Sequence, residues 1–346
     1  MDFINLLLSA TQPSGMWAKI IFGLEKSIGS YGWTLIVITL LIRLVLLPTD
    51  FLNRYITKVN TRKMAVLQPE LNKIQKAYGN NKDMLNRKTM ELYKRENYSV
   101  IGTCLGMLVS LVLTTVVFFT LCGSLNKISS YKIYTEFETL QTTYNEVYNA
   151  GYSESLTETE LKELKARSEA AVVAKYSEIK ENFLWVKNIW RADTSQSVIP
   201  KYKDFTKLIN KVQGVEEKPT EEEYNKIMSC VDNENSGWNG YYILTVLAAI
   251  ATFVSAQIPT WIAKIKAKKR HEAYAPVQQN QIMSYLLPLV MALFTLFYTA
   301  SFAIYIVVGS LFAMITQPAL TLIVDAIDSK KAKKEQESKK VSYSRK

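Results

Sequence analysis

The chain has 346 residues, a formal net charge of +11 and a mean hydropathy of +0.00. This average combines long apolar stretches with strongly basic ones, so the composition excludes an ordinary water-soluble globular protein. The three cysteines and the single histidine lack the spacing of metal ligands. The serines and aspartates of residues 129–240 have no histidine near them in the sequence, and the chain contains no GxxxxGK[ST] phosphate loop. We therefore predict no metal, no cofactor, no catalytic residue and no enzyme activity.

Residues 1–30 carry an apolar stripe at helical spacing, formed by Trp17, Ile20, Ile21, Leu24 and Ile28. The stripe predicts an external amphipathic helix that lies on the outer membrane surface. A helix that precedes the membrane spans and packs against them would show the same pattern. No lysine or arginine precedes the short apolar run at the start, which is unlike a signal peptide.

Residues 31–52 form the first predicted membrane span, with Arg43 near its centre. The apolar run from Trp33 to Leu52 covers about 30 Å, the thickness of a bilayer core. An arginine near the centre costs at least about 3 kcal/mol to insert. The nearest acid, Asp50, lies two turns away on the same helix, and the span ends about 13 Å from Arg43, roughly twice the reach of its side chain. We therefore favour a water-filled pocket over an arginine that snorkels or thins the bilayer.

Residues 53–97 predict a cytosolic helical hairpin. Apolar residues recur at three- and four-residue spacing at Met64, Leu67, Leu71, Ile74 and Tyr78. The sequence Gly-Asn-Asn at residues 79–81 breaks this pattern, and a second amphipathic helix is expected over residues 82–96. The basic outer face of the hairpin is either a solvated surface or a contact site for lipid headgroups or a partner.

Further apolar stretches predict spans at residues 98–126, 241–262, 282–298 and 302–324. The expected fold is therefore all-α, a polytopic membrane protein with five transmembrane helices. Only residues 299–301 separate the last two spans, so a tight helical hairpin is expected there. Residues 127–240 predict an external helical segment of one or two small elements, without a large core of its own.

Basic residues in the short connections predict the orientation of the chain. Residues 53–97 hold 11 Lys and Arg against 4 acids, the loop at 263–281 holds 5 against 1, and the tail at 325–346 holds 8 against 4. All three lie on one side of the predicted membrane, which the positive-inside rule assigns to the cytosol. Residues 129–240 hold 14 basic and 19 acidic residues, a net charge of −5 that fits an external location. We expect an external N-terminus and a cytosolic C-terminus.

Polar side chains within the spans are candidates for a hydrated groove shared with Arg43. Taken singly, most of them are better explained by hydrogen bonding between packed membrane helices. Together with Arg43 they favour a polar groove inside the bilayer. The candidates are Thr39, Ser110, Thr114, Thr115, Ser255, Gln257, Thr295, Ser310 and Gln317.

Several runs of the chain resemble the YidC/Oxa/Alb family of membrane protein insertases. These runs are YGWTLIVITLLIRLVLLP, which contains Arg43, then KMAVLQPELNKIQKAYGNNKDMLNRKTMELYKREN and GTCLGML. The similarity resumes at FLWVKNIW, at YYILTVLAAIATFV and at MSYLLPLVMALFTLFYTASFAIYIVVGSLFAMITQ. An arginine-bearing span followed by LQPEL and a five-span layout is a specific combination.

The resemblance implies an insertase that performs no covalent chemistry and releases its substrates laterally into lipid. In this family a groove open to the cytosol and to lipid receives the polar part of a substrate, and Arg43 matches the groove arginine. The implied partner-binding residues of the hairpin are Met64, Leu67, Gln68, Pro69, Leu71 and Tyr78. Expected partners are nascent membrane proteins, membrane lipids, the ribosome, the signal recognition machinery and the Sec translocon, but not DNA. The expected location is the bacterial plasma membrane.

The chain departs from the family pattern at Gly106, Ser255 and Ser310, where proline, glutamine and asparagine are common. Residues 191–240 also separate the FLW element from the third span, where relatives have a short connection. Two other functions stay open. One is a small-solute or anion transporter that uses Arg43, although no internal repeat of the spans and no discontinuous helices are evident. The other is a non-enzymatic membrane scaffold.

Overall fold

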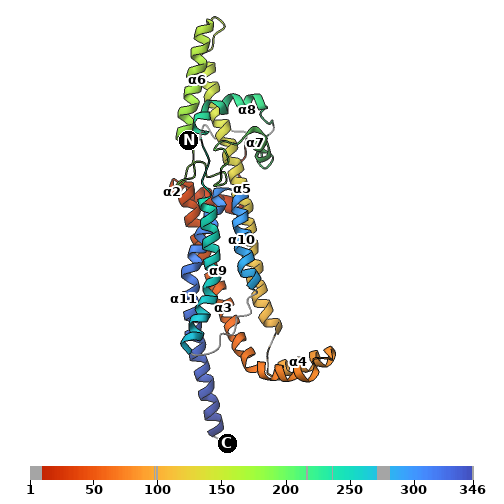
Figure 1. Ribbon diagram of the computed structural model, residues 1–346. Coiled ribbons are helices and arrows are strands. Elements are labelled where there is room, and N and C mark those ends of the chain that lie inside the picture. Colours follow the sequence, from red (N-terminus) through yellow and green to blue (C-terminus); the bar gives the residue numbers. More distant parts are fainter. Residues whose placement is uncertain are drawn as a thin grey trace. The chain divides into compact units, whose positions relative to one another are not determined.

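The computed structural model describes residues 10–96, 98, 100–215, 217–235, 237–270 and 281–344. Every regular element in these residues is a helix, and the only β pairing among them is three isolated bridges. The all-α prediction is therefore confirmed (Figure 1). The chain forms two compact units. Unit 1 comprises Met1–Leu40, Phe119–Ala256 and Gln278–Leu311, and unit 2 comprises Leu41–Phe118, Gln257–Val277 and Phe312–Lys346.

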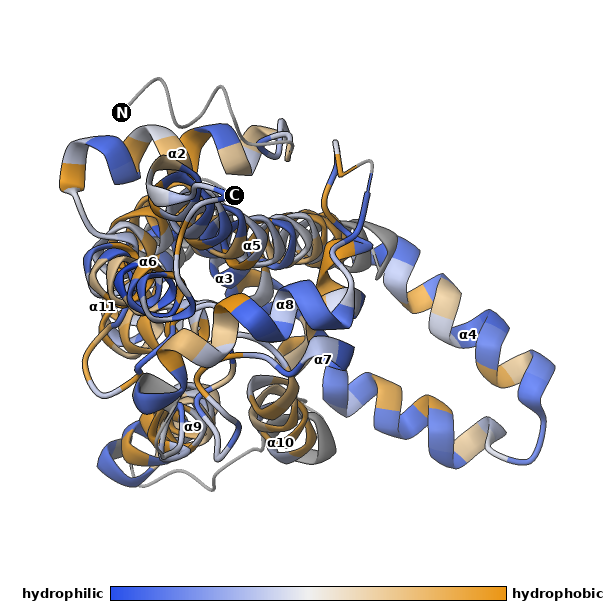
Figure 2. Ribbon diagram, turned by 90° about the horizontal axis from the view of Figure 1, so that it is seen from above, coloured by the Kyte–Doolittle hydropathy of each residue, from blue (hydrophilic) through white to orange (hydrophobic). Residues whose placement is uncertain are grey.

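Four described helices are long and apolar enough to cross a membrane. They are α3 (Tyr31–Tyr78), α5 (Val100–Gly151), α9 (Ile243–Arg270) and α11 (Ala300–Ser344). The helix α10 (Gln281–Phe297) has 17 residues and coincides with the fourth predicted span. Figure 2 shows that its ribbon is mainly hydrophobic. Two residues, Tyr298 and Thr299, separate α10 from α11, which agrees with the short connection expected from the sequence.

The helix α3 continues past the first predicted span into the first half of the predicted hairpin. It is 48 residues long and contains Pro48 and Pro69. The expected break follows at Tyr78, and α4 (Lys82–Arg95) begins after Asn81, whose side-chain oxygen accepts a hydrogen bond from the Met84 amide at 3.1 Å. Asparagine is among the preferred residues at this position because its short side chain satisfies an otherwise unpaired amide.

The predicted N-terminal amphipathic helix is α2 (Met16–Ile28). It packs in unit 1 through the buried Ala18 and Ile21, while Met16 and Ile20 leave apolar surface exposed. The Trp17 indole donates a hydrogen bond to the Thr120 hydroxyl of α5 at 3.0 Å. The helix therefore both packs on α5 and presents an apolar face outward, so features of both sequence interpretations are present.

Residues 127–240 contain a buried aromatic cluster and more helices than the one or two small elements expected from the sequence. They comprise the C-terminal part of α5 and α6 (Glu158–Ile179), α7 (Tyr202–Ile209), α8 (Glu221–Met228) and the 3₁₀ helix η1 (Ser229–Asn235). The rings of Phe137, Phe205 and Tyr224 are buried, with centroids of Phe137 and Phe205 5.2 Å apart and those of Phe205 and Tyr224 4.3 Å apart. These residues are far apart in sequence, so no local periodicity reveals their cluster.

The start of α9 is held by the buried carboxylate of Asp193 in unit 1. Its oxygens accept hydrogen bonds from the backbone amides of Tyr241 at 2.8 Å and Leu244 at 2.6 Å, and from the Trp185 indole at 3.2 Å. The Asn239 side chain donates to the carbonyls of Asn188 and Ala192. The FLWVKNIW element and the residues after it therefore position the start of a candidate membrane span.

Candidate functional site

Arg43 lies on the side of α3 that faces away from the exposed apolar stripe of this helix. Leu41, Leu44 and Val45 are exposed, Val45 by 76%, whereas Arg43 is half-buried and its Nε atom is buried. At about 100° per residue, Arg43 points about 150° away from the centre of that stripe. An arginine on this side does not face lipid through the exposed stripe, which agrees with the interpretation of a polar surrounding.

Two glutamine amides of unit 2 carry buried polar atoms that lack hydrogen bonds among the described residues. These atoms are Nε2 of Gln257 on α9 and Oε1 of Gln317 on α11. Buried polar groups in proteins are almost always hydrogen-bonded to protein or water. Their environment in unit 2 therefore suits water or the polar groups of a bound chain.

Three further candidate residues of unit 2 lie on α5. Ser110 is buried, whereas Thr114 and Thr115 are exposed. Unit 2 thus contains six of the ten predicted groove residues: Arg43, Ser110, Thr114, Thr115, Gln257 and Gln317.

The other four predicted groove residues lie in unit 1, and all four are buried: Thr39, Ser255, Thr295 and Ser310. The hydroxyls of Thr39, Ser255 and Thr295 donate to carbonyls of their own helices, at Leu35 (2.5 Å), Thr252 (2.9 Å) and Ala292 (2.7 Å). Such bonds within a helix are the usual solution for a hydroxyl on a buried helix face. The packing interpretation therefore explains these three hydroxyls, and their role in a groove stays a prediction.

The predicted hairpin buries Leu67 of α3 and Leu92 of α4. Arg95 of α4 forms an ion pair and a hydrogen bond with Glu70 of α3, which joins the two helices. Among the predicted partner-binding residues, Met64, Leu71 and Tyr78 are half-buried, whereas Gln68 and Pro69 are exposed. The LQPEL element thus presents only part of its side chains to solvent, and its partner-binding role stays a prediction.

The sequence analysis missed an ionic cluster in unit 2. The carboxylate of Asp325 on α11 contacts Lys58 of α3 at 2.8 Å and also pairs with Lys266 of α9. One turn further along α11, Asp328 pairs with Arg62 of α3 at 3.2 Å. The basic residues were predictable only as charges in cytosolic connections. Their acidic partners are too distant in sequence for a local pattern to identify the pairs.

Comparisons with known proteins agree with the resemblance noted in the sequence. A "Membrane protein insertase YidC" of Fusobacterium nucleatum is 41% identical over 87 residues, 25% of this chain and 40% of that protein. Proteins with the same name from Aromatoleum aromaticum and Legionella pneumophila are each 31% identical over 97 and 111 residues, which cover 28% and 31% of this chain. These two alignments cover 17% and 19% of the relatives, so the chain spans less than half the length of the curated relatives it matches.

The family comparison covers far more of the chain. Residues 23–326 match the sequence profile described as "60Kd inner membrane protein". This range includes Arg43, the hairpin of α3 and α4, the FLWVKNIW element, the helices α3, α5 and α9, and α11 as far as residue 326. The chain therefore belongs to the 60Kd inner membrane protein family.

Proposed function

We propose that this protein is a membrane protein insertase of a bacterial membrane. The observation that carries the proposal is the family match over residues 23–326, together with relatives that are named insertases. The protein receives newly made membrane proteins and releases them laterally into the bilayer. This function requires no covalent step, so it needs neither a catalytic residue nor a cofactor.

The proposed substrate path includes the polar groups of unit 2. Arg43 faces away from the exposed apolar stripe of α3, and the amides of Gln257 and Gln317 hold buried atoms without hydrogen-bond partners among the described residues. A polar lining lowers the cost of bringing a hydrophilic segment into the bilayer, because water and protein dipoles replace the hydration that the segment loses. The guanidinium of Arg43 adds an attraction for acidic residues of the substrate.

Release into lipid has a separate driving force. Burial of the apolar helix of the substrate contributes about 25 cal/mol for each Å² removed from water. The path therefore has to lower a barrier for the polar segment rather than supply the energy of insertion. A fixed cation and unsatisfied amides suit this task.

The proposed topology has five spans at residues 31–52, 98–126, 241–262, 282–298 and 302–324, with an external N-terminus and a cytosolic C-terminus. Support comes from the four long apolar helices and from the basic connections at 53–97, 263–281 and 325–346. The 17 residues of α10 reach the lower limit of about 17 for a transmembrane helix. Residues 271–280, within the connection at 263–281, lie outside the described residues.

The proposed partners follow from the same topology. Nascent membrane proteins are the substrates, and the hairpin of α3 and α4 receives them from the ribosome, the signal recognition machinery or the Sec translocon. The basic tail at 325–346 lies on the same side as the hairpin and would face anionic lipid or ribosomal RNA.

Site-specific photocrosslinking tests the substrate path. A photoreactive residue at Gln317, which is half-buried on α11, is compared with one at Ile315, which lies two residues away and is 76% exposed. The partner is a ribosome-bound single-span nascent chain in membranes that contain the full-length protein. We expect crosslinks from position 317 and only lipid adducts from position 315. Equal crosslinking from both positions would contradict a defined path, and solute flux would then be the next measurement.

A further inference from the structure

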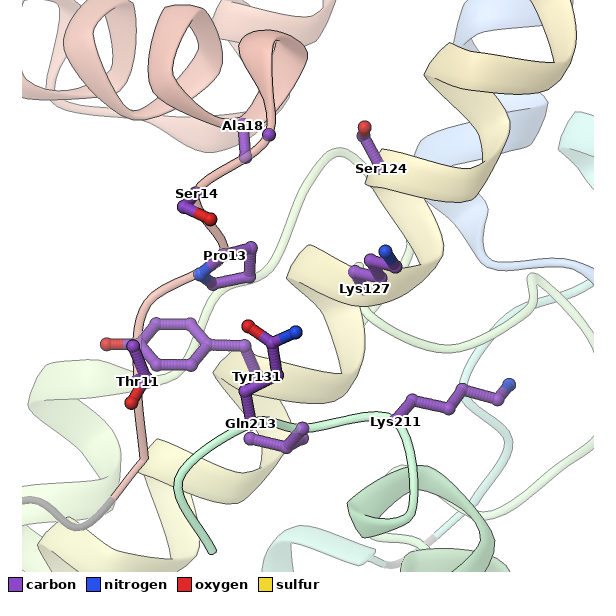
Figure 3. A pocket seen from close by; sticks show the side chains of 11 residues that line it. Thr11, Pro13, Ser14, Ala18, Ser124, Lys127, Tyr131, Lys211 and Gln213 are labelled. Carbon is purple, nitrogen blue, oxygen red and sulfur yellow. The ribbon is translucent and has the colours of Figure 1, made fainter.

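A cavity of about 100 Å³ lies in unit 1, and none of the residues proposed for the substrate path lines it. Figure 3 shows that its side chains come from the segment before α2, from the start of α2, from α5 and from the turn after α7. The polar lining comprises Thr11, Ser14, Ser124, Lys127, Lys211 and Gln213. A single buried water requires roughly 10–15 Å³, so this cavity has room for a small polyatomic group.

The cavity carries positive charge. Its lining includes Lys127 and Lys211 and contains no aspartate or glutamate. Lys127 makes no hydrogen bond or ion pair within the described part of the chain. Lys211 makes only a long hydrogen bond of 3.5 Å to the side-chain oxygen of Asn126. Both lysines are exposed, and Figure 3 shows the Lys211 side chain directed away from the other lining residues. Either ammonium group can reach a ligand with negatively charged oxygens at the open side of the cavity when its long, flexible side chain turns toward it.

The walls of the cavity are joined by the backbone. The amide of Thr11 donates to the carbonyl of Gln213 at 2.7 Å, and these two residues form an isolated antiparallel bridge. The start of α2 lies beside α5 at the cavity, because a Cβ atom on Gly15 would lie 3.9 Å from the Ser124 hydroxyl. No side chain caps this helix, so the positive end of its dipole adds to the lysine charges.

The cavity adjoins the part of α5 that presents apolar surface. Phe119 is 65% exposed, and Lys127 follows it by about 12 Å along the helix. Trp17 of α2, which bonds to Thr120, is a residue type enriched where a membrane meets water. A phospholipid whose acyl chains contact the apolar part of α5 would thus place its headgroup near the two lysines.

We propose that this cavity binds the phosphate group of an anionic phospholipid headgroup. The exposed side chains of Lys127 and Lys211 turn toward the phosphate oxygens and pair with them, and the Ser124 hydroxyl donates a hydrogen bond to the phosphate. Free inorganic phosphate offers the same chemistry, so the experiment has to separate the two sources. The site goes beyond the proposed insertase function and requires only that α5 crosses the membrane.

The test uses the purified full-length protein in detergent and counts bound lipids by native mass spectrometry. Phosphatidylglycerol is titrated against phosphatidylcholine, with and without excess inorganic phosphate. The double variant Lys127→Ala/Lys211→Ala is compared with Lys19→Ala/Lys26→Ala, which removes two exposed lysines of α2 that do not line the cavity. Circular dichroism and size-exclusion chromatography verify that both variants remain folded.

We expect the wild-type protein to retain phosphatidylglycerol in preference to phosphatidylcholine. The cavity variant should bind it about 25-fold more weakly, from about fivefold for each lysine, and the control variant within about twofold of wild type. Equal weakening in both variants would overturn the proposal, because general surface charge would then explain the binding. Inorganic phosphate that binds without any preference for phosphatidylglycerol would overturn the lipid assignment. Insertion activity is measured in a separate assay. Failure of the lipid-site proposal can therefore be distinguished from failure of the proposed insertase function.

Discussion

The carboxylate of Asp325 on α11 lies 2.8 Å from the ammonium of Lys58 on α3. The same carboxylate pairs with Lys266 on α9, so one acid joins three helices of unit 2. Two of these helices, α9 and α11, carry Gln257 and Gln317, and the third carries Arg43. The ionic cluster therefore stabilises the helices on which the proposed substrate path depends.

We predict that Asp325→Asn lowers the stability of unit 2 by about 1 kcal/mol, because two lysines lose a partly solvated anionic partner. The measurement is thermal unfolding in detergent at low and high salt. The difference from wild type should shrink at high salt, since added ions screen such contacts. Glu146→Gln, a change at an exposed carboxylate, is the control. A salt-independent loss of stability would indicate that packing, not charge, accounts for the effect.

The buried carboxylate of Asp193 supports a second prediction. Asp193→Ala leaves the amides of Tyr241 and Leu244 without their acceptor and should cost about 2–4 kcal/mol. Gly240→Ala should act in the same direction, because a Cβ atom there would lie 1.8 Å from an Asp193 oxygen. Limited proteolysis near residue 240 reports the expected loosening of the start of α9. Glu217→Gln, a change at an exposed carboxylate outside the network, is the control and should change proteolysis little.

Arg43 supports a prediction on substrate choice. Arg43→Ala should reduce insertion of a single-span substrate with an acidic external tail about fivefold, which corresponds to about 1 kcal/mol of lost attraction. Arg43→Lys should retain most of the activity, because the positive charge remains. Protease protection of the tail in reconstituted vesicles measures insertion. Val45→Ala, on the exposed stripe of α3, is the control.

The same experiment with a neutral tail separates two roles of Arg43. A purely electrostatic role predicts that Arg43→Ala leaves insertion of the neutral substrate nearly unchanged. Equal losses for both tails would show that the arginine maintains the path itself rather than attracting acidic residues.

The N-terminus of α6 provides a prediction on pH. Glu160 accepts a hydrogen bond from the Thr157 amide at 2.8 Å, and this backbone bond, with a further bond from the Thr157 hydroxyl, lowers the pKa of Glu160. Because the folded pKa is lowered, the stabilisation is present above the unfolded pKa of about 4.3 and is lost as the pH falls below it. Amide exchange in the first turn of α6 should therefore accelerate in acid relative to the helix centre. Glu160→Gln should remove most of this pH dependence. If the variant keeps the wild-type pH profile, another titratable group causes the pH dependence of amide exchange.

Two deletions distinguish the parts of the region between α6 and α9. Deletion of residues 200–235 removes α7, α8 and η1 but keeps Asp193, and the pairing of Ser197 with Trp238 allows a short linker to close the gap. Deletion of residues 191–235 also removes Asp193. We predict that the second deletion lowers the amount of folded protein in the membrane more than the first, as measured by size-exclusion chromatography. Equal losses would assign the main stabilising role to the aromatic core instead.

Local features of the fold could be predicted from the sequence. The stripe before Ile28 predicted α2, and the Gly-Asn-Asn sequence predicted the end of α3 at Tyr78. The hydropathy of long segments predicted the apolar parts of α3, α5, α9 and α11, although these helices continue beyond the predicted spans. These features depend on residues within one or two helical turns or on the length of an apolar run. A single sequence contains that information directly.

The contacts that hold the helices were decided only by the tertiary structure. Asp325 meets Lys58, Asp193 meets Leu244, and Phe137 meets Phe205, although each pair is separated by 50 or more residues. The cavity between the segment before α2 and α5 arises in the same way. The sequence by itself determined the long apolar helices, the amphipathic helix before them and the break after Tyr78, because apolar burial and helix termination depend on local composition. The tertiary structure decided which polar groups become partners, because those energies depend on distances between side chains that the order of residues does not specify.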